Sequence, residues 1–433
     1  MTMTADPAGT AAPPTGARRL LPDPPAARLV DHLARFGPLP VRGAELIGEV
    51  ERAGLRGRGG AGFPTAVKME AVRANGARFL KGRPPIVVAN GTEGEPLSAK
   101  DKTLLVHAPH LVLDGAVAAA NAIGADVVCV CVERRATPVV RALQHAIDER
   151  SRSRADGIEV KLGATPSRYV AGEETALIHW LNGGDAKPTF TPPRPFERGV
   201  VNRPTLVDNV ETLAHVGLIA RFGAQWYRSA GTAREPGTML VTVNGVERPG
   251  VYEVPLGTSL RHVLRNAGAH DVAGVLVGGY FGTWLTPQQA AMVSLTAEDL
   301  TTMHAALGCG ALGVIGAGAC PVAEIARITR WFANQSAGQC GPCTFGLPAI
   351  ADALDHMARG ADRDGRAEAA ARRWLAMVEG RGACKLPDGA VRFVRSGLAV
   401  FADHVAEHRT TGRCRAPGGA PALPVPRAEA SWR

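Results

Sequence analysis

The sequence is poor in aromatic residues, in cysteine and in long apolar runs. Phe, Trp and Tyr make up 5% of its 433 residues, and it has 8 cysteines. The longest apolar candidate, residues 104–132, is interrupted by His107, Asp114 and Asp126, among others. A helix that crosses a bilayer needs about 20 predominantly apolar residues. We therefore expect no direct membrane insertion.

Charges of one sign are not gathered into blocks either. Lys and Arg number 49 against 40 Asp and Glu, a net charge of +9, but no Lys/Arg-rich stretch with interleaved aromatics occurs. This argues against nucleic-acid binding. The positive excess favours attraction of anionic nucleotides or of an acidic partner protein, with an ordinary solvated surface as the default explanation.

The two ends of the chain have the composition of disordered tails. Residues 1–25 are rich in Ala, Pro and Thr without a contiguous apolar segment, and residues 416–433 are similar. We expect both to be disordered. We also expect a cytoplasmic location, with peripheral docking on a membrane complex left open.

Residues 26–230 alternate between amphipathic segments and short apolar runs. The expected helices are residues 44–53, 104–122 and 139–149, and the expected strands are residues 85–89, 127–132 and 157–162. This alternation predicts an α/β domain with a Rossmann-like parallel sheet, whose ligand site lies at the strand-to-helix turns.

Two further regions follow. Residues 234–290 contain short β-branched runs (239–243, 250–254 and 275–277), an Asn244-Gly245 hairpin signal and a helix near 260–267, which together predict a small β-grasp module. Residues 318–412 show apolar positions at helical spacing and predict a helical bundle with helices at 322–332, 347–357, 367–378 and 391–405.

Three separated motifs carry the chemistry. They are Gly57-Arg58-Gly59-Gly60-Ala61-Gly62-Phe63-Pro64-Thr65, Asn90-Gly91-Thr92-Glu93-Gly94-Glu95-Pro96 and Tyr169-Val170-Ala171-Gly172-Glu173-Glu174-Thr175. The first offers backbone N–H groups to a phosphate, because glycines let the main chain approach an anion. Arg56, Arg58 and Lys68 add positive charge. The other two supply carboxylates and amides for ribityl hydroxyls and a nicotinamide nucleotide, so the ordered set predicts a flavin mononucleotide (FMN) pocket.

Alternative interpretations exist for each motif. Gly57, Gly59 and Gly62 match the dinucleotide pattern G-x-G-x-x-G, but that fingerprint follows a strand, whereas a helix precedes these glycines. The glycines alone are also compatible with a simple chain turn. Loop glutamates, taken singly, are more often solvated surface than site. Tyr169 is as compatible with core packing as with stacking on a ring.

The cysteines divide into two groups. Cys340, Cys343 and Cys384 lie in the helical region and predict metal ligation. The run Cys340-Gly341-Pro342-Cys343 also matches a thioredoxin-type redox motif, but the helical approach to it disfavours that function. Cys129, Cys131, Cys309 and Cys320 lie in apolar surroundings and are expected to be buried packing residues.

With these residues in view, the chain resembles the flavin-bearing, NADH-oxidising subunit of respiratory complex I, a type shared with NAD-linked hydrogenases and formate dehydrogenases. The likeness runs from about Pro38 to Phe401. It includes the three motifs, the later run of residues 203–212, the β-grasp module, which is of the SLBB type in this family, and the helical iron-sulfur-type domain.

The resemblance implies residue roles. The residues expected around FMN are Gly57, Arg58, Gly59, Gly60, Lys68, Asn90, Glu93, Gly172, Glu173, Val207, Asn209 and Thr212, and those expected to face NADH are Phe63, Glu95, Tyr169 and Glu174. The resemblance also implies that a 4Fe-4S cluster takes electrons from the flavin, with Cys340, Cys343 and Cys384 as ligands. It further implies that the next electron acceptor is an iron-sulfur partner subunit or a ferredoxin-like protein.

The chain departs from the family at three places. The first cluster cysteine is replaced by Ala337, so the fourth ligand would be Ser336, water or another cysteine, or else the cluster is labile or absent. Aromatic residues that flank the adenine correspond to Ala71 and Arg194, and a nearby lysine to Thr191. An aspartate near the flavin is replaced at residue 92 by threonine.

Three functional hypotheses follow. In the first, the protein is an FMN-dependent NADH:acceptor oxidoreductase that passes single electrons to an iron-sulfur cluster or partner. In the second, the losses at Ala71, Arg194 and Ala337 mark a degenerate electron-relay or assembly subunit that does not oxidise NADH. In the third, the protein is an FMN enzyme that uses another hydride donor.

Overall fold

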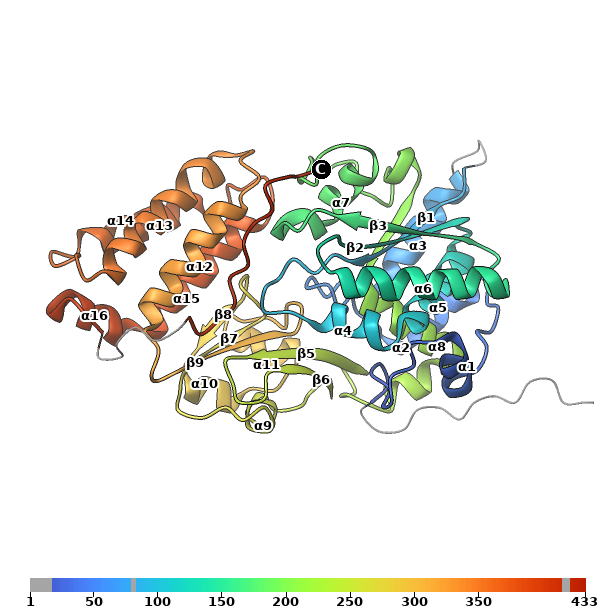
Figure 1. Ribbon diagram of the computed structural model, residues 1–433, viewed down its shortest axis with the longest axis horizontal. Coiled ribbons are helices and arrows are strands. Elements are labelled where there is room, and N and C mark those ends of the chain that lie inside the picture. Colours follow the sequence, from blue (N-terminus) through green and yellow to red (C-terminus); the bar gives the residue numbers. More distant parts are fainter. Residues whose placement is uncertain (1–17, 79–82, 415–420) are drawn as a thin grey trace, which may run out of the picture.

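The computed structural model describes residues 18–78, 83–414 and 421–433. A parallel α/β part, a mixed sheet and a group of C-terminal helices follow one another along the chain (Figure 1).

The first sheet is four-stranded and fully parallel, in the order β3-β2-β1-β4. Its strands are β1 (Ile86–Gly91), β2 (Val127–Glu133), β3 (Glu159–Thr165) and β4 (Thr205–Asn209). Val87 and Ala89 join the core on one face, and Ile86 and Val88 join a smaller core on the other. Burial on both faces explains the continuous apolar runs, and the predicted parallel sheet is confirmed.

Helices cover both faces of this sheet. They are α1 (Leu29–Phe36), α2 (Glu45–Ala53), α3 (Thr65–Arg78), α4 (Lys100–His107), α5 (Pro109–Ile123), α6 (Thr137–Ser153), α7 (Glu174–Leu181) and α8 (Val210–Arg228). The buried helices α5 and α8 pack on each other beneath the sheet, and α7 covers the opposite face. The glycine motif is the connection between α2 and α3, so no strand precedes it, as predicted.

One helix predicted from the sequence is divided into two helices in the structure. The sequence predicts a single helix over 104–122, but α4 ends at His107 and α5 begins at Pro109, which has no N–H to continue the ladder. Within the described residues no single helix is long and apolar enough to cross a membrane; α4 and α5 pass that test only as a pair, and the two are bent by 97°.

The second sheet has five strands in the order β6-β5-β9-β7-β8. They are β5 (Thr238–Asn244), β6 (Gly250–Pro255), β7 (Val272–Val277), β8 (Thr283–Leu285) and β9 (Ala311–Gly316), accompanied by α9 (Leu260–Asn266), α10 (Pro287–Met292) and α11 (Ala297–Thr302). The hairpin at residues 244–245 and the helix after it lie where the sequence predicts them. β9 lies between β5 and β7, so the sheet extends beyond the expected module boundary at residue 290.

The helical part contains α12 (Pro321–Gln335), a π-helical turn (Pro342–Gly346), α13 (Leu347–Ala358), α14 (Arg366–Val378), α15 (Leu386–Val400) and α16 (Ala402–Thr411). The helix expected over 391–405 is divided at Phe401 into α15 and α16. Trp331, Phe332 and Phe393 form the centre of its aromatic core.

The described parts of both tails are packed, contrary to the expectation of disorder. Leu20 is fully buried, and the Arg19 guanidinium donates to the carbonyls of Trp226 and Tyr227. Residues 1–17 and 415–420 lie outside the described residues. Residues 421–433 run from α12 to the edge of the first sheet, which the red trace in Figure 1 shows.

The tail segment 421–433 joins two parts of the molecule. The N–H of Leu423 donates to Glu324 on α12, and the Trp331 indole donates to the carbonyl of Pro426 at 2.9 Å. At the other end Glu429 accepts from the N–H of Ser167 at 2.8 Å. The guanidinium carbon of Arg168 lies over the Trp432 ring, 3.9 Å from the ring centre. A cavity of about 490 Å³ lies beneath the crossing segment.

We predict that Trp432→Ala lowers the free energy of unfolding by about 1–2 kcal/mol, because the cation–π contact with Arg168 and the buried part of the indole are lost. Urea unfolding of both proteins measures this difference. Arg427→Ala, an exposed position of the same segment, is the matched control. Equal midpoints for the wild type and both variants would show that the tail contributes nothing to stability.

Candidate functional site

The three motifs meet at the carboxyl ends of β1 and β4. The N–H of Arg58 donates to Thr212 Oγ1 at 2.8 Å, on the first turn of α8. The preceding Asn209 donates from Nδ2 to the carbonyl of Asn90 at 3.3 Å, and Asn90 donates in turn to the carbonyl of Gly172 at 2.8 Å. A chain of hydrogen bonds therefore links the glycine turn to the two acidic motifs.

The glycine turn presents a row of unused donors. It is closed at its base, where Arg56 pairs with Pro64 and the N–H of Gly57 donates to the carbonyl of Phe63 at 2.8 Å. Gly60 has a φ of +118°, which a side chain would strain. In the described part of the chain, no hydrogen bond engages the N–H groups of residues 59–62, and they lie at the surface. Such a turn fits an anionic phosphate.

Of the three cations predicted beside this turn, Arg56 donates from Nε to the carbonyl of Gly62 at 2.9 Å, and Arg58 and Lys68 have different positions. The Arg58 guanidinium is buried and points inward, donating to Tyr227 Oη at 3.1 Å and to the carbonyl of Thr238 at 3.2 Å. Its side chain therefore anchors the turn to the core. Lys68, on the first turn of α3, donates to the carbonyl of Val207 at 2.5 Å and lies 3.5 Å from Glu174 Oε2. Its ammonium keeps partial exposure beside the turn.

Two motif carboxylates act as helix caps. Glu93 accepts from the N–H groups of Asp101 and Lys102, both at 3.1 Å, at the start of α4. Burial, reinforced by the Asp101 carboxylate, raises the pKa of Glu93. Glu173 accepts from the N–H groups of Thr175 and Ala176 at the start of α7, and burial raises its pKa as well. Both carboxylates thus fix the loops that carry them.

The two acidic motifs also touch through backbone. A Cβ atom placed on Gly172 would lie 2.6 Å from the carbonyl oxygen of Thr92, which is closer than real Cβ contacts. Only glycine permits this approach. The contact holds the loop after β1 against the turn before α7.

Glu95 and Tyr169 form a second connection. The Tyr169 hydroxyl donates to Glu95 Oε2 at 3.0 Å, and the N–H of Tyr280 donates to the same oxygen at 2.9 Å. The Tyr169 ring lies edge-on to Phe281 and Trp331, each with ring centres 4.9 Å away. Of the two interpretations of Tyr169, the structure shows packing among aromatic side chains, with the hydroxyl held by Glu95.

The sequence did not single out Lys100 and Asp101, which support the site from within. The Lys100 ammonium lies 2.6 Å from Asp101, 2.8 Å from Glu211 and 3.1 Å from Asn209. Burial alone would lower the pKa of Lys100, but the Asp101 and Glu211 carboxylates raise it well above its usual value. The available signal was an adjacent Lys-Asp pair at the start of α4, shortly after the second motif.

The three predicted metal-binding cysteines come together next to the third motif. Cys340 and Cys343 lie at the π-helical turn, where the N–H of Cys343 donates to the carbonyl of Cys340 at 3.1 Å. Burial raises the pKa of the Cys343 thiol to about 12, with an opposing hydrogen bond from Ser336 and a further increase from Cys340 and Cys384. Burial and then Glu173 raise the pKa of Cys384.

These cysteines fit an iron-sulfur group in donor type, with one position altered. The Cys343 thiol interacts with Ser336, Cys340 and Cys384, while Ala337 supplies no ligand atom. The influence of Glu173 on Cys384 places this region beside the cap of α7, and therefore beside the end of the sheet where the motifs meet.

Two family models match the regions that hold the motifs and the cysteines. The family model of the Nuo51 FMN-binding domain matches residues 50–218, and that of the NADH-ubiquinone oxidoreductase-F iron-sulfur binding region matches residues 323–408. The second NADH-quinone oxidoreductase F subunit of Rhizobium meliloti is 33% identical over 389 residues, covering 86% of this chain and 90% of that protein. The corresponding F subunit of Mycobacterium bovis is 34% identical over 395 residues, covering 86% of each.

A solved structure shares the fold as well. The crystal structure of NAD+-reducing [NiFe]-hydrogenase in the H2-reduced state matches with a TM-score of 0.78 and 32% identity over 89% of this chain. The chain spans 65% of the length of that hydrogenase chain. With matches of this extent, the chain belongs to the family of NADH-quinone oxidoreductase F subunits.

Proposed function

We propose that the protein oxidises NADH with a bound FMN and passes the electrons to an iron-sulfur cluster. The observation that carries this function is the meeting of the open glycine turn, Lys68 and the Asn209–Asn90–Gly172 hydrogen-bond chain at one edge of the sheet. The cysteine group lies beside the same edge. The alternative of a subunit that does not oxidise NADH is not favoured, because relatives of the NADH-quinone oxidoreductase family match along most of the chain.

FMN, when bound, accepts a hydride and releases its electrons one at a time. The residues of the chain bind this cofactor and orient it. We assign the phosphate to the free N–H groups of the glycine turn and to the Lys68 ammonium, since the turn is exposed and the ammonium keeps partial exposure. Asn90, Asn209 and Thr212 fix the turn relative to the sheet, and Val207 holds Lys68 through its carbonyl. No protein acid or base is needed for hydride transfer.

We assign the nicotinamide nucleotide to the face of Phe63, an aromatic side chain that is 53% exposed beside the glycine turn. We also assign Glu95 and Glu174 to the nucleotide site; Glu95 accepts from the Tyr169 hydroxyl, and Glu174 pairs with Lys68. Arg194, an exposed residue in the loop after α7, offers a planar guanidinium where relatives in the family have an aromatic residue.

We assign the cluster to Cys340, Cys343 and Cys384, with Ser336 as the fourth ligand. The hydrogen bond between Ser336 and Cys343 supports this choice over a distant cysteine. We further propose an iron-sulfur partner subunit or a ferredoxin-like protein as the acceptor, and a cytoplasmic, peripheral position in the assembly.

Anaerobic purification with FMN tests this function. We expect flavin absorbance that NADH bleaches, and an iron-sulfur electron paramagnetic resonance signal that develops on reduction. Cys340→Ala should remove the iron-sulfur signal and leave the flavin bleaching. A flavin-loaded protein that NADH fails to bleach would overturn the proposed activity, and an unchanged resonance signal in Cys340→Ala would overturn the ligand assignment.

Lys68→Met should weaken FMN binding by about 10- to 100-fold, because a hydrogen bond to a charged group contributes about 1.5–3 kcal/mol. Quenching of flavin fluorescence during titration of the apoprotein measures the affinity. Arg73→Met is the matched control, since Arg73 lies on the same helix and pairs with Glu70 at the surface. Unchanged affinity in Lys68→Met would separate this lysine from the phosphate site.

Glu95 should make stability depend on pH. Burial raises its pKa from 4.5 to about 7, against opposing hydrogen bonds from Leu97, Tyr280 and Tyr169. Between these values the folded protein binds more protons than the unfolded chain, so stability falls as pH rises and is level above about 7. Glu95→Gln should remove this pH dependence, which changes the free energy of unfolding by at most about 3 kcal/mol between the two pKa values.

Urea unfolding of the wild type and Glu95→Gln, from below pH 4.5 to above pH 7, measures this effect. Burial also raises the pKa of Glu253 to about 7, and this contribution is common to both proteins. The difference between them therefore isolates Glu95. Parallel pH profiles would contradict the prediction.

A further inference from the structure

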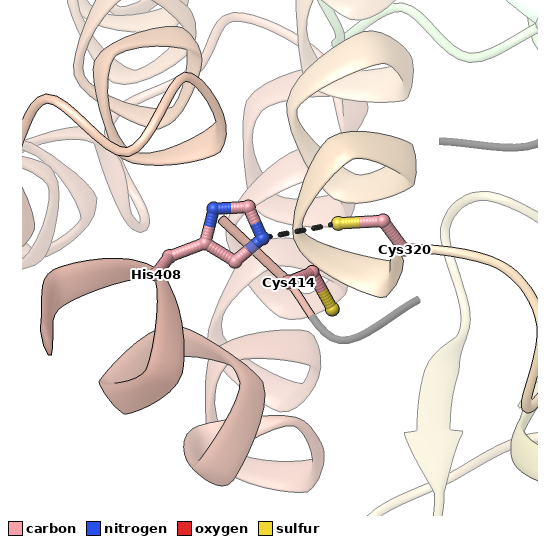
Figure 2. A group of neighbouring side chains, drawn as sticks. All are labelled: Cys320, His408 and Cys414. Carbon is pink, nitrogen blue, oxygen red and sulfur yellow. Dashed lines mark hydrogen bonds between the residues drawn. The ribbon is translucent and has the colours of Figure 1, made fainter. Parts of the chain in front are cut away.

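A second group of sulfur and imidazole side chains lies at the opposite end of α12 from the iron-sulfur cysteines. Cys320 Sγ lies 3.2 Å from His408 Nε2, and His404 Nδ1 lies 3.0 Å from Cys414 Sγ. Figure 2 shows the His408 ring pointing at Cys320, with Cys414 beside them. The ligand atoms of Cys320, His408 and Cys414 all lie within 4.8 Å of one another.

These separations suit one tetrahedral ion. Zinc binds sulfur at about 2.3 Å and nitrogen at about 2.0–2.1 Å, so ligand atoms around it lie roughly 3.5–3.8 Å apart. The two sulfur-to-nitrogen distances, 3.2 and 3.0 Å, are close to this, and Cys414 belongs both to the group with Cys320 and His408 and to the group with His404. Two thiolates and two imidazoles are a donor set typical of structural zinc.

Local structure places each ligand. His404 and His408 are four residues apart on α16 and so share a helix face. The helix ends at Gly412, which has a φ of +80° and turns the chain so that Cys414 returns toward the histidines. Cys320 is the N-cap of α12, where its sulfur accepts from the N–H of Ala323 at 3.4 Å.

The sequence predicts Cys320 as a buried packing residue. It is buried, at 8% exposure, and so is Cys414 at the same value, but their thiols face imidazole nitrogens rather than apolar atoms alone. Apolar packing does not require two such pairs in one place.

We propose that Cys320, Cys414, His404 and His408 bind a structural zinc ion that fastens α16 to the start of α12. Glu407 lies with His404 and Cys414 at the edge of this group and supplies further negative charge. The site is independent of the flavin chemistry. α12 has 15 residues, about 22 Å at 1.5 Å per residue, and this length separates the zinc site from Ser336 and the cysteines that follow it.

The test uses the full-length protein, purified without a metal-affinity tag, incubated with excess ZnSO₄ and freed of loose metal by gel filtration. In protein that carries its iron-sulfur cluster, elemental analysis should give one zinc per chain. The double variant Cys320→Ser/Cys414→Ser should retain none. Co²⁺ loading should give the visible bands of a tetrahedral thiolate site in the wild type only.

His408→Ala provides a second variant that leaves both thiols in place, and His356→Ala on α13, an exposed histidine, is its matched control. We expect at least a 10-fold loss of zinc affinity in His408→Ala and none in His356→Ala. Chelation of zinc should lower the thermal midpoint of the wild type but leave that of the double variant unchanged.

Zinc well below one per chain in the loaded wild type would overturn the proposal. Equal zinc in the double variant would do the same, as would a Cys320–Cys414 disulfide in protein kept under reducing conditions. A double variant too unstable to purify leaves His408→Ala and Co²⁺ spectra of the wild type to decide.

Discussion

A single buried positive charge, the Lys100 ammonium, organises the end of the parallel sheet. It joins α4 to α8 through Asp101 and Glu211, and it fixes the Asn209 side chain that reaches Asn90. Removing one partner from a buried ion pair costs about 3–5 kcal/mol, because the remaining charge has no water to solvate it. The relative positions of β1, β4 and the glycine turn therefore depend on this lysine being charged and fully paired.

The motif glutamates hold the loops of the site in the same way. Glu93 and Glu173 each complete the start of a helix, and this use of their oxygens positions the backbone rather than a free carboxylate. The Glu173 carboxylate also contributes to raising the pKa of Cys384, so the cap of α7 neighbours both the acidic motifs and the cysteine group.

Local patterns predicted much of this fold. The apolar runs of β1 and β2, the helix before the glycine turn and the hairpin at Asn244 depend on neighbouring residues, and they lie as expected. The partners of Tyr169 and Lys100 are brought by chain segments far away in sequence, and periodicity carries no information about them. β9 was missed for the same reason, since it enters its sheet between strands formed much earlier. The break at Pro109 was readable from proline chemistry alone.

The crossing of residues 421–433 has a consequence for how the protein forms. This segment is synthesised after both of the parts that it joins, so the α/β part and the helices can only be tied together once translation has passed them. Until then residues 421–433 do not yet pack on the aromatic core around Trp331 or on Arg168. This joining is therefore a late event in maturation. A cofactor inserted earlier would enter a protein whose α/β part and helices are not yet held together by residues 421–433.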